Sequence, residues 1–481
     1  MSERLYYVCL VILAQYNDAG SADLDGILLG LLSAIGVFGL RLLQWYLYLG
    51  RRLKKNYLSD ADTWIFLIDA RKIREDGYKL SARIREGSIE ADKYYPPLFF
   101  YILAVFPEKA VKFMVKYGPV VSDASIAFVL SVMAASATNN LMLAFAGTFV
   151  YLSSPMIFQQ TFCLCIRPLS ILLVSLVYVF SCPFSLPNFV AMTILIAAIL
   201  LLHKFATQVV FFTALAFLFI GRIDYLFAVA SGFAVALLVS KGYYLNVLKA
   251  HIGHIRSDYL KRFVHSHGGT AWRRTAALAV YCPWLLFFAI SLPVLGTDVL
   301  SQSLLCAVVW VIALAFMAAL TNFAGFRMIG EGWRYIGYLA FPLAIYAAYS
   351  VGYSSFLLWL YVPFVATGLA LGYYYVLRLF RRHEKFLISN KDIETFTGLS
   401  SVAGSTVAAY PKEFTYPISY FSHKEYAAKL ELDFENRAAE LADIIVLNKQ
   451  YTDSSIHENL MQRGYTVKLE KQVWTAYSRR P

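Results

Sequence analysis

Long apolar runs are the feature that most restricts what this chain can fold into. A helix needs about 20 apolar residues to cross a hydrocarbon core of about 30 Å. The chain of 481 residues is 59% hydrophobic and 15% charged, with a mean hydropathy of +0.56, which exceeds what one soluble core can bury. We therefore predict a polytopic, mainly α-helical membrane protein of roughly eleven spans, at about Gly26–Leu49, Pro119–Ser136, Leu141–Phe158, Leu169–Ser181, Asn188–Leu202, Val209–Ile220, Tyr225–Ser240, Ala276–Leu295, Leu304–Leu320, Tyr335–Val351 and Ser355–Leu377.

The net charge of +12 does not point to nucleic acid in such a chain. Lys and Arg of membrane proteins contact lipid phosphates or lie in loops, so membrane lipids are the expected partners. All six cysteines lie in or beside apolar segments, which predicts neither a disulfide framework nor a thiolate metal site. Arg41 interrupts the first span, where a charge costs about 2.5–3.5 kcal/mol. We expect it to face the helix bundle or to reach the membrane surface.

Polar residues gather in the stretch from Ser59 to Pro97, which follows the first span. Counting crossings places this stretch on the same side as the other polar loops, while the opposite side keeps short turns. Short basic loops are normally cytoplasmic. That rule weakens where basic residues are retained to bind an anion, and we expect the polar loops and the polar C-terminal part of the chain to lie on the non-cytoplasmic side.

Several motifs resemble those of the GT-C membrane glycosyltransferases, over roughly residues 26 to 380. The matching segments are Asp60-x-Asp62-x-Trp64, Ala70–Gly77, Tyr95-Pro-Pro-Leu98, Arg167-Pro-Leu169, His203-Lys204 and Gly330-Glu-Gly-Trp-Arg-Tyr335 leading to Phe341-Pro342. The resemblance implies an inverting hexosyl- or pentosyltransferase of the cell envelope, in the plasma membrane or its equivalent. It would take a sugar from a polyprenyl-phosphate or polyprenyl-diphosphate carrier at the non-cytoplasmic face and pass it to a hydroxyl of a glycan, lipid or protein.

Two departures limit what can be carried over from the family. Ile65-Phe66 stands where relatives resembling the oligosaccharyltransferases have a polar residue after the loop aspartate, and the Trp-Trp-Asp signature is absent. Transfer of a whole oligosaccharide to asparagine is therefore disfavoured. A divalent cation such as Mg²⁺ or Mn²⁺, held by Asp60 and Asp62, is in doubt for the same reason.

Sugar transfer to a hydroxyl needs a base for the acceptor's proton. We expect Asp62 to be that base, with Asp60 in support or as a metal ligand. The alternative is that these residues cap the helix that follows, since Asp is favoured at an N-cap. Trp64, Tyr94 and Tyr95 are candidates for stacking on the sugar, although tyrosines are also common at membrane interfaces.

The departing phosphate needs cations. Arg167, His203, Lys204 and Arg334 are the candidate donor-phosphate ligands, because guanidinium and ammonium groups suit phosphate oxygens. Individually they could equally be span-end residues that reach toward water. Glu331 is a candidate substrate contact, but pairing with Arg334 three residues later is the stronger interpretation.

Two further segments carry predictions. The four histidines His251, His254, His265 and His267 could ligate zinc, but an amphipathic helix over Tyr243–Val264 that lies on lipid is favoured. We predict two domains, a GT-C-like transmembrane domain over 1–380 with a first external loop over 50–118, and a small soluble α/β domain over 381–481. The latter should contain strands at Lys385–Ser389, Asp443–Asn448, Tyr465–Glu470 and Gln472–Ser478 and a helix over His423–Leu441.

Other functions remain open at this stage. A transporter or flippase for an anionic lipid or a lipid-linked sugar would also place basic groups beside membrane helices. Such a protein is expected to carry polar residues near the midplane of several spans, whereas most spans predicted here contain no charged residue. A non-catalytic assembly subunit is the third alternative, and the presence of both Asp60 and Asp62 argues against it.

Overall fold

The computed structural model describes residues 22–49, 57–58, 61–79, 84–86, 89–91, 95–160, 166–181, 185–256, 270–296, 301–323, 326, 329–330, 332–383, 387–411, 414–426, 442–452 and 454–479. The side chains of some residues within these ranges, Asp62 among them, are not described. The described residues divide into two compact units, which are considered separately. Unit 1 lies within Met1–Gln44, Tyr117–Phe162 and Ile166–Leu377, and unit 2 lies within Trp45–Lys116, Cys163–Cys165 and Arg378–Pro481.

Unit 1 is built from helices, three of which (α2, α5 and α18) continue past its boundaries. Its apolar segments form helices because a backbone in lipid must satisfy its own hydrogen bonds. In chain order the helices are α2 (Ala22–Leu49), α5 (Glu108–Thr138), α6 (Leu141–Leu152), α7 (Pro155–Gln160), α8 (Ile166–Ser181), α9 (Leu186–Leu202), α10 (Lys204–Leu218), α11 (Ile223–Val239), α12 (Tyr243–Arg256), α14 (Ala271–Tyr281), α15 (Trp284–Leu295), α16 (Gln302–Leu320), α17 (Gly332–Tyr353) and α18 (Ser355–His383).

Among the described residues, five helices are long and apolar enough to cross a membrane. The number rises to seven if the bent pairs α11 with α12 and α14 with α15 each form one span. Helices α6, α8, α9 and α10 are apolar but have only 12 to 17 residues, which is short of the usual length. The protein is therefore an integral membrane protein, and the count of roughly eleven spans stays a prediction.

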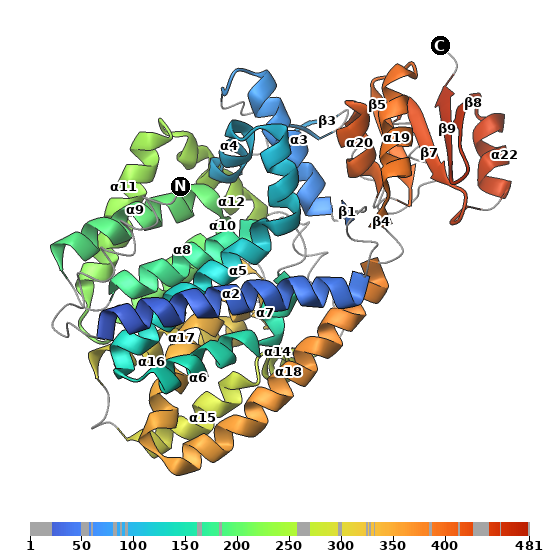
Figure 1. Cartoon of the computed structure of the whole chain (residues 1–481). Helices are drawn as coiled ribbons and strands as arrows, with labels where there is room; N and C mark the ends of the chain where they lie inside the picture. Colours follow the sequence, from blue (N-terminus) through green and yellow to red (C-terminus); the bar gives the residue numbers. More distant parts are fainter. Residues whose placement is uncertain are drawn as a thin grey trace. The chain divides into compact units, whose positions relative to one another are not determined.

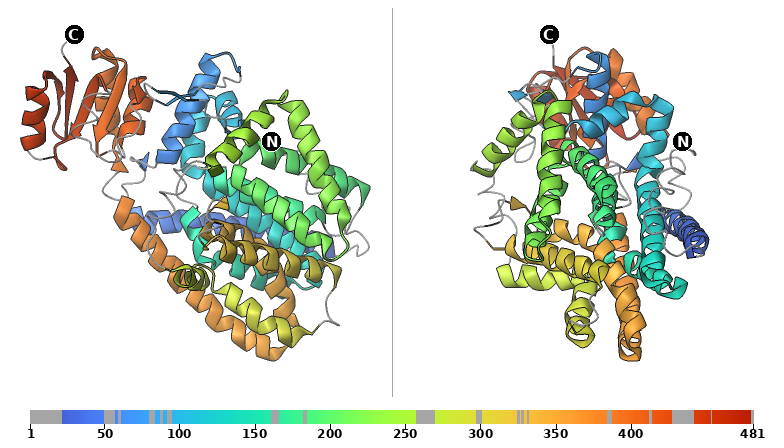
Figure 2. Two further views of the ribbon diagram at one scale, coloured as in Figure 1. Left: turned by 180° about the vertical axis from the view of Figure 1, so that it is seen from behind. Right: turned by 90° about the vertical axis from the view of Figure 1, so that its left-hand side faces the viewer.

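Helix α17 lies at the centre of unit 1. It packs against α16, α6, α15 and α8, and the views in Figure 2 show these helices stacked side by side. Seventeen of its residues are buried. Its first residue, Gly332, is so close to α16 that a Cβ there would overlap the carbonyl oxygen of Ala318. The packing thus fixes the residues at the start of α17.

The charge in the first span faces inward. Arg41 is fully buried, and its Nε lies 2.6 Å from Oδ2 of Asp123 on α5. The same carboxylate accepts a short hydrogen bond from the hydroxyl of Tyr151 on α6, and Nη1 of Arg41 donates to Gln44 at 3.1 Å. Of the two positions that the sequence allowed for Arg41, the structure has the one inside the bundle.

Unit 2 combines the segment after α2 with the C-terminal part of the chain. Strand β1 (Tyr57–Leu58) pairs antiparallel with β4 (Leu387–Ile388), although they are more than 300 residues apart in the sequence. The segment between α2 and α5 also contains α3 (Ala61–Glu75), the hairpin of β2 (Ile84–Glu86) and β3 (Ile89–Ala91), and α4 (Leu98–Val105). Helix α3 contacts both α4 and a C-terminal helix, α20 (Thr415–Ser422).

The C-terminal part of unit 2 is a five-stranded mixed sheet of order β6-β5-β7-β9-β8. Strands β6, β5 and β7 are parallel, whereas β9 is antiparallel to β7 and to β8. Helix α20 contacts β5 and β6, and α22 contacts β8 (Figure 1). The elements are α19 (Asn390–Gly398), a 3₁₀ turn (Leu399–Ser401), β5 (Thr406–Tyr410), α20, β6 (Glu425–Tyr426), β7 (Ile444–Asn448), α22 (Ser454–Gln462), β8 (Tyr465–Glu470) and β9 (Trp474–Arg479).

The four predicted strands of this part are confirmed as β4, β7, β8 and β9, with ends that differ by at most two residues. The predicted helix over His423–Leu441 is wrong at its start. Helix α20 already ends at Ser422, and His423 has a left-handed backbone with φ of 55° that terminates it. Residues 427–441 lie outside the described ranges. The predicted division at residue 380 stays a prediction.

Candidate functional site

Two arginines of unit 1 share one indole ring. Arg167 is the second residue of α8, and Trp333 and Arg334 lie in the first turn of α17. The Cζ atoms of Arg167 and Arg334 lie 5.0 and 5.5 Å from the centre of the Trp333 ring. Contacts of this kind attract a cation to the face of an aromatic ring. Trp333 therefore holds two positive charges in one place despite their mutual repulsion.

The guanidinium of Arg167 is available to a ligand. Within the part of the chain that the structure describes, it has no hydrogen-bond acceptor and no carboxylate partner, and the residue is half-buried. A guanidinium presents five N–H donors in a planar fork, which matches the oxygens of phosphate and carboxylate groups. An anion is the natural ligand for such a group.

A layer of hydroxyl groups lies one turn further along the same helices. Tyr338, four residues after Arg334, places its Oη 2.8 Å from Oγ of Ser170 and 3.2 Å from Nδ1 of His203. His203 is the residue of the turn between α9 and α10. Burial, followed by the positive charges of Arg167 and Arg334, lowers the pKa of His203 to about 3. The ring is neutral at neutral pH and can offer a ligand a hydrogen bond but no charge.

A cavity of about 650 Å³ lies beside this cluster of side chains. Lys204, the residue after His203, belongs to its lining together with Thr207, Gln208 and His251. The remaining lining is almost wholly aliphatic and aromatic: Ile196, Ile199, Leu200, Val210, Phe211, Phe212, Leu226, Val229, Ala230, Phe233, Tyr244, Val247, Leu248 and Ile329. The cavity is thus lined mainly by apolar side chains, with the cation Lys204 among its few polar ones, a lining suited to a molecule with a long apolar tail and an anionic head.

Helix α12 forms one wall of this cavity, through Tyr244, Val247 and His251. His251 lies 3.2 Å from Nε2 of Gln208, and Oη of Tyr335 donates to Oε1 of Gln208 at 3.1 Å. The segment predicted to lie on lipid therefore contacts α10 through His251 and Gln208 and lines the cavity, and its contact with lipid stays a prediction. His265, His267 and the side chain of His254 lie outside the described ranges.

The remaining predicted residues belong to unit 2. Asp62 is the second residue of α3, but its side chain is not described. Trp64 is only 2% exposed and packs 5.4 Å from Tyr420 and 5.2 Å from Phe421 between ring centres. Its position is that of a packing residue, and a sugar contact for it stays a prediction.

Tyr95 is half-buried, with its ring 5.8 Å from that of Phe100. Asp60, Tyr94 and Glu331 lie outside the described ranges. Within those ranges, no group of three or more His, Cys, Asp or Glu residues is close enough to hold a metal ion. The cation predicted at Asp60 and Asp62 stays a prediction.

No protein-family model and no curated protein sequence matches this chain. Solved structures do match. ArnT from Cupriavidus metallidurans in the apo state gives a TM-score of 0.58 at 12% identity, over 92% of this chain and 97% of ArnT. The same protein bound to undecaprenyl phosphate gives 0.56 at 11% identity, over 92% and 97%. The apo oligosaccharyltransferase from Archaeoglobus fulgidus gives 0.56 at 10% identity, over 96% of this chain and 75% of that one.

ArnT and the oligosaccharyltransferases are GT-C proteins. This chain has the GT-C fold. The predicted fold class is thereby confirmed, with the helical membrane part followed by a small C-terminal sheet. At these identities the likeness concerns the fold, and the roles of individual residues must come from the chain's own geometry.

Within the GT-C fold, the structure adds residues that the sequence reasoning missed. Trp333 stands between the predicted residues Glu331 and Arg334, yet only the folded chain shows both guanidiniums on its ring. Tyr338 and Gln208 were also missed. Their spacing from Arg334 and Lys204, four residues in each case, is one helical turn, and that is the signal that could have found them.

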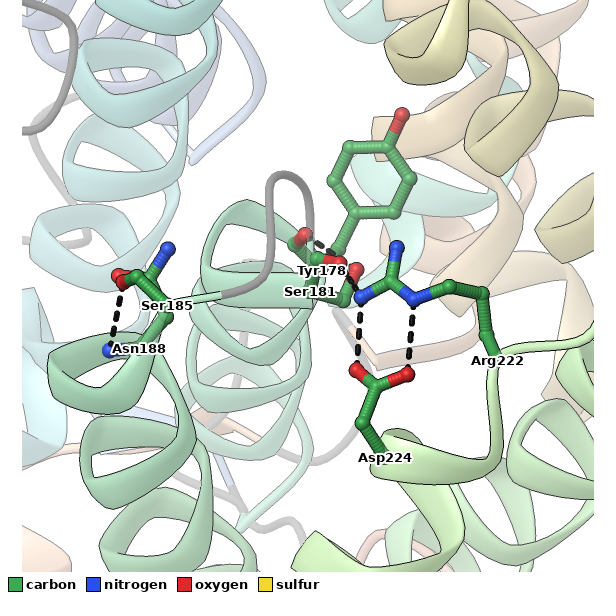
Figure 3. A network of polar contacts seen from close by, with 6 residues as sticks. All are labelled: Tyr178, Ser181, Ser185, Asn188, Arg222 and Asp224. Carbon is green, nitrogen blue, oxygen red and sulfur yellow. Dashed lines mark hydrogen bonds and ion pairs between the residues drawn. The ribbon is translucent and has the colours of Figure 1, made fainter.

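A different polar cluster lies at the end of α8 and at the starts of α9 and α11, and it is shown in Figure 3. Arg222 donates to both carboxylate oxygens of Asp224 at 2.8 Å and to the carbonyl of Ser181, at the end of α8, at 2.7 Å. Ser185 caps the first turn of α9 by accepting from the Asn188 N–H at 3.3 Å. These groups satisfy helix ends. The guanidinium available to a ligand, that of Arg167, lies at the other end of α8.

Proposed function

We propose that this protein is a membrane glycosyltransferase that moves one sugar from a polyprenyl-phosphate or polyprenyl-diphosphate carrier to a hydroxyl of a glycan, lipid or protein, with inversion and at the non-cytoplasmic face. The observation that carries the proposal is the apolar cavity with Lys204 in its lining, together with the arginines on Trp333. This lining suits a prenyl chain with a phosphate head. A protein of the same fold, ArnT, is known bound to undecaprenyl phosphate, and this supports the carrier class.

The charge change of the reaction explains why cations are needed. A sugar attached to polyprenyl phosphate is a phosphodiester with one negative charge. When the bond between the sugar carbon and the phosphate oxygen breaks, the carrier keeps the electron pair and becomes a monoester with a second negative charge. Arg167, Arg334 and Lys204 then stabilise the departing phosphate more strongly than the bound donor, and this difference lowers the barrier.

The other half of the reaction occurs at the acceptor. Its hydroxyl oxygen attacks the sugar carbon from the side opposite the phosphate, which inverts the configuration, and the hydroxyl proton passes to Asp62 as general base. Neutral His203 is assigned a hydrogen bond to a phosphate oxygen, with its ring held by Tyr338. A divalent cation at Asp60 and Asp62 remains a secondary proposal.

The test is transfer of radiolabelled sugar from a pool of polyprenyl-phosphate sugars by membranes that contain the native protein or variants. Asp62→Asn should lower the rate by about 10²–10⁴-fold, the usual contribution of a general base. Arg167→Gln should lower it by about 10²–10³-fold, as the loss of one preorganised donor does. Arg273→Gln removes an exposed arginine of α14 and should leave the rate unchanged.

The alternatives predict different results. A flippase for lipid-linked sugars would show no transfer by the native protein and would move a labelled donor across vesicle membranes, a movement that Arg167→Gln would slow. An assembly subunit would show neither activity. Equal transfer by the native protein and both site variants would contradict the assignment of Asp62 and Arg167.

A further inference from the structure

Helix α3 depends on its neighbours for its position. It has 15 residues, and isolated helices of this length are marginal in water. The buried residues Trp64, Leu67, Ile68 and Ala70 form its apolar face. The direction in which its first turn presents Asp62 is therefore set by what packs on this face and by what holds its polar residues.

One of its arginines fastens α3 to α20. Nη1 of Arg71 donates to the carbonyl oxygen of Tyr420 at 2.7 Å and lies 3.1 Å from Nδ1 of His423. The guanidinium also lies 5.4 Å from the centre of the Tyr420 ring. Tyr420 is in the last turn of α20, where carbonyls have no partner within the helix and a cation is favoured. Arg71 therefore caps the C-terminal end of α20.

A second arginine of α3 does the same for α4. Nε of Arg74 donates to the carbonyl of Ala104 at 3.0 Å, and its Nη2 donates to the carbonyl of Phe106 at 2.7 Å. Both carbonyls belong to the end of α4. The two arginines differ in reach, because Arg74 bonds residues about 30 positions away, whereas Arg71 bonds a carbonyl 349 positions away.

The contact with α20 extends along α3 to its first turn. Trp64, two residues from Asp62, packs against Tyr420 and Phe421, and Arg71 holds the same segment of α20 about two turns later. Attachment of α3 to α20 at both Trp64 and Arg71 restricts two movements of α3, rotation about its own axis and sliding along that axis. Attachment at one of these residues would restrict only one movement.

We propose that Arg71 is a positioning residue through which the C-terminal part of the chain orients the helix that carries the catalytic base. The inference rests on the proposed function, in which Asp62 receives the acceptor's proton. It gives the C-terminal sheet and its helices a role in turnover without any contact with substrate. A displacement of about 1 Å at a reacting group can cost about 10²-fold in rate, so a modest loosening of α3 is sufficient.

The test compares Arg71→Met with Lys79→Met in the full-length protein. Lys79 is exposed and follows α3. Its replacement by Met removes one positive charge, as Arg71→Met does, and so serves as the matched control. Arg71→Met should lower kcat for transfer about 10- to 100-fold with the donor KM unchanged, since the donor cations lie on α8, α10 and α17. Lys79→Met should match the native protein. Arg71→Lys keeps the cation and one donor, and should recover part of kcat.

A double variant separates positioning from general loss of structure. In an Asp62→Asn background, Arg71→Met should reduce the residual rate no further, because Arg71 acts only through the carboxylate. Multiplied effects, or a rise in donor KM together with the fall in kcat, would overturn the inference. A fully active Asp62→Asn variant would instead refute the base itself and, with it, the proposed mechanism.

Discussion

The buried pair of Arg41 and Asp123 allows a prediction about stability that does not depend on function. Both side chains are almost fully withdrawn from solvent, at 0% and 2% exposure, and their closest atoms are 2.6 Å apart. Removal of one partner of such a pair leaves an uncompensated charge and costs about 3–5 kcal/mol. We therefore expect Asp123→Leu to lower the free energy of unfolding by about 3–5 kcal/mol.

The two partners should not be equivalent. Guanidinium groups stay charged in proteins, so Asp123→Leu leaves a permanent cation inside the bundle. Arg41→Leu leaves a carboxyl group that still accepts the hydroxyl of Tyr151. The loss of stability should therefore be smaller for Arg41→Leu. The double variant Arg41→Leu/Asp123→Leu should be more stable than Asp123→Leu alone, because apolar replacement of a whole buried pair is often neutral.

These differences can be measured by unfolding in mixed micelles at increasing mole fractions of SDS, followed by far-ultraviolet circular dichroism. Ser125→Ala, two residues along α5, is the control, since its hydroxyl donates to the carbonyl of Val121 one turn before, within the same helix. A change of less than 1 kcal/mol for Asp123→Leu would refute the argument. So would a double variant less stable than Asp123→Leu.

Two further predictions concern single residues. Burial raises the pKa of Asp443, but hydrogen bonds from the backbone and hydroxyl groups of Ser405 and Thr406 outweigh it and hold that pKa below its ordinary 3.8. Its contribution to stability is thus complete above pH 3.8 and is lost as pH falls through the lower value in the folded state. Thermal unfolding between pH 7 and 3 should show this loss in the native protein and not in Asp443→Asn, and equal slopes would contradict it. Gly330 has a φ of 151°, and a Cβ there would lie 2.5 Å from Cε2 of Phe205. Gly330→Ala should therefore lower the free energy of unfolding by about 1–3 kcal/mol and raise the donor KM. An unchanged unfolding curve and an unchanged KM would show that the segment before α17 adapts freely.

The apolar pattern predicted the helical membrane part because lipid leaves the backbone few alternatives. The span predicted to start at Pro119 agrees with the apolar span Tyr117–Thr138, although its helix, α5, begins earlier, at Glu108, and runs through the proline. In the C-terminal sheet, strands with alternating or aliphatic runs such as Tyr465–Glu470 were found. Strand β5, Thr406–Tyr410, was not, since its alanines carry little strand preference.

The candidate site was predicted in part, for reasons that lie in its geometry. Charged residues at helix ends are visible in a sequence, and Arg167, His203 and Arg334 do gather in unit 1. The grouping of the two arginines on Trp333 depends on the packing of α8 against α17, which no local pattern encodes. Helix α20 was missed because its sequence, TYPISYFS, contains a proline and mostly residues with weak helix preference.

The long sequence separation between Arg71 and its partner Tyr420 also determines when this contact can form during synthesis. The ribosome completes α3 long before it makes Tyr420, which follows Arg71 by 349 residues. At about 5–20 residues per second this interval lasts about 17 to 70 s. The strand partner of Tyr57 and Leu58 is delayed in the same way, since it is Leu387–Ile388. During this interval the membrane helices are inserted while Trp64 still lacks its contacts with Tyr420 and Phe421, so a segment translated late completes the packing of one translated early.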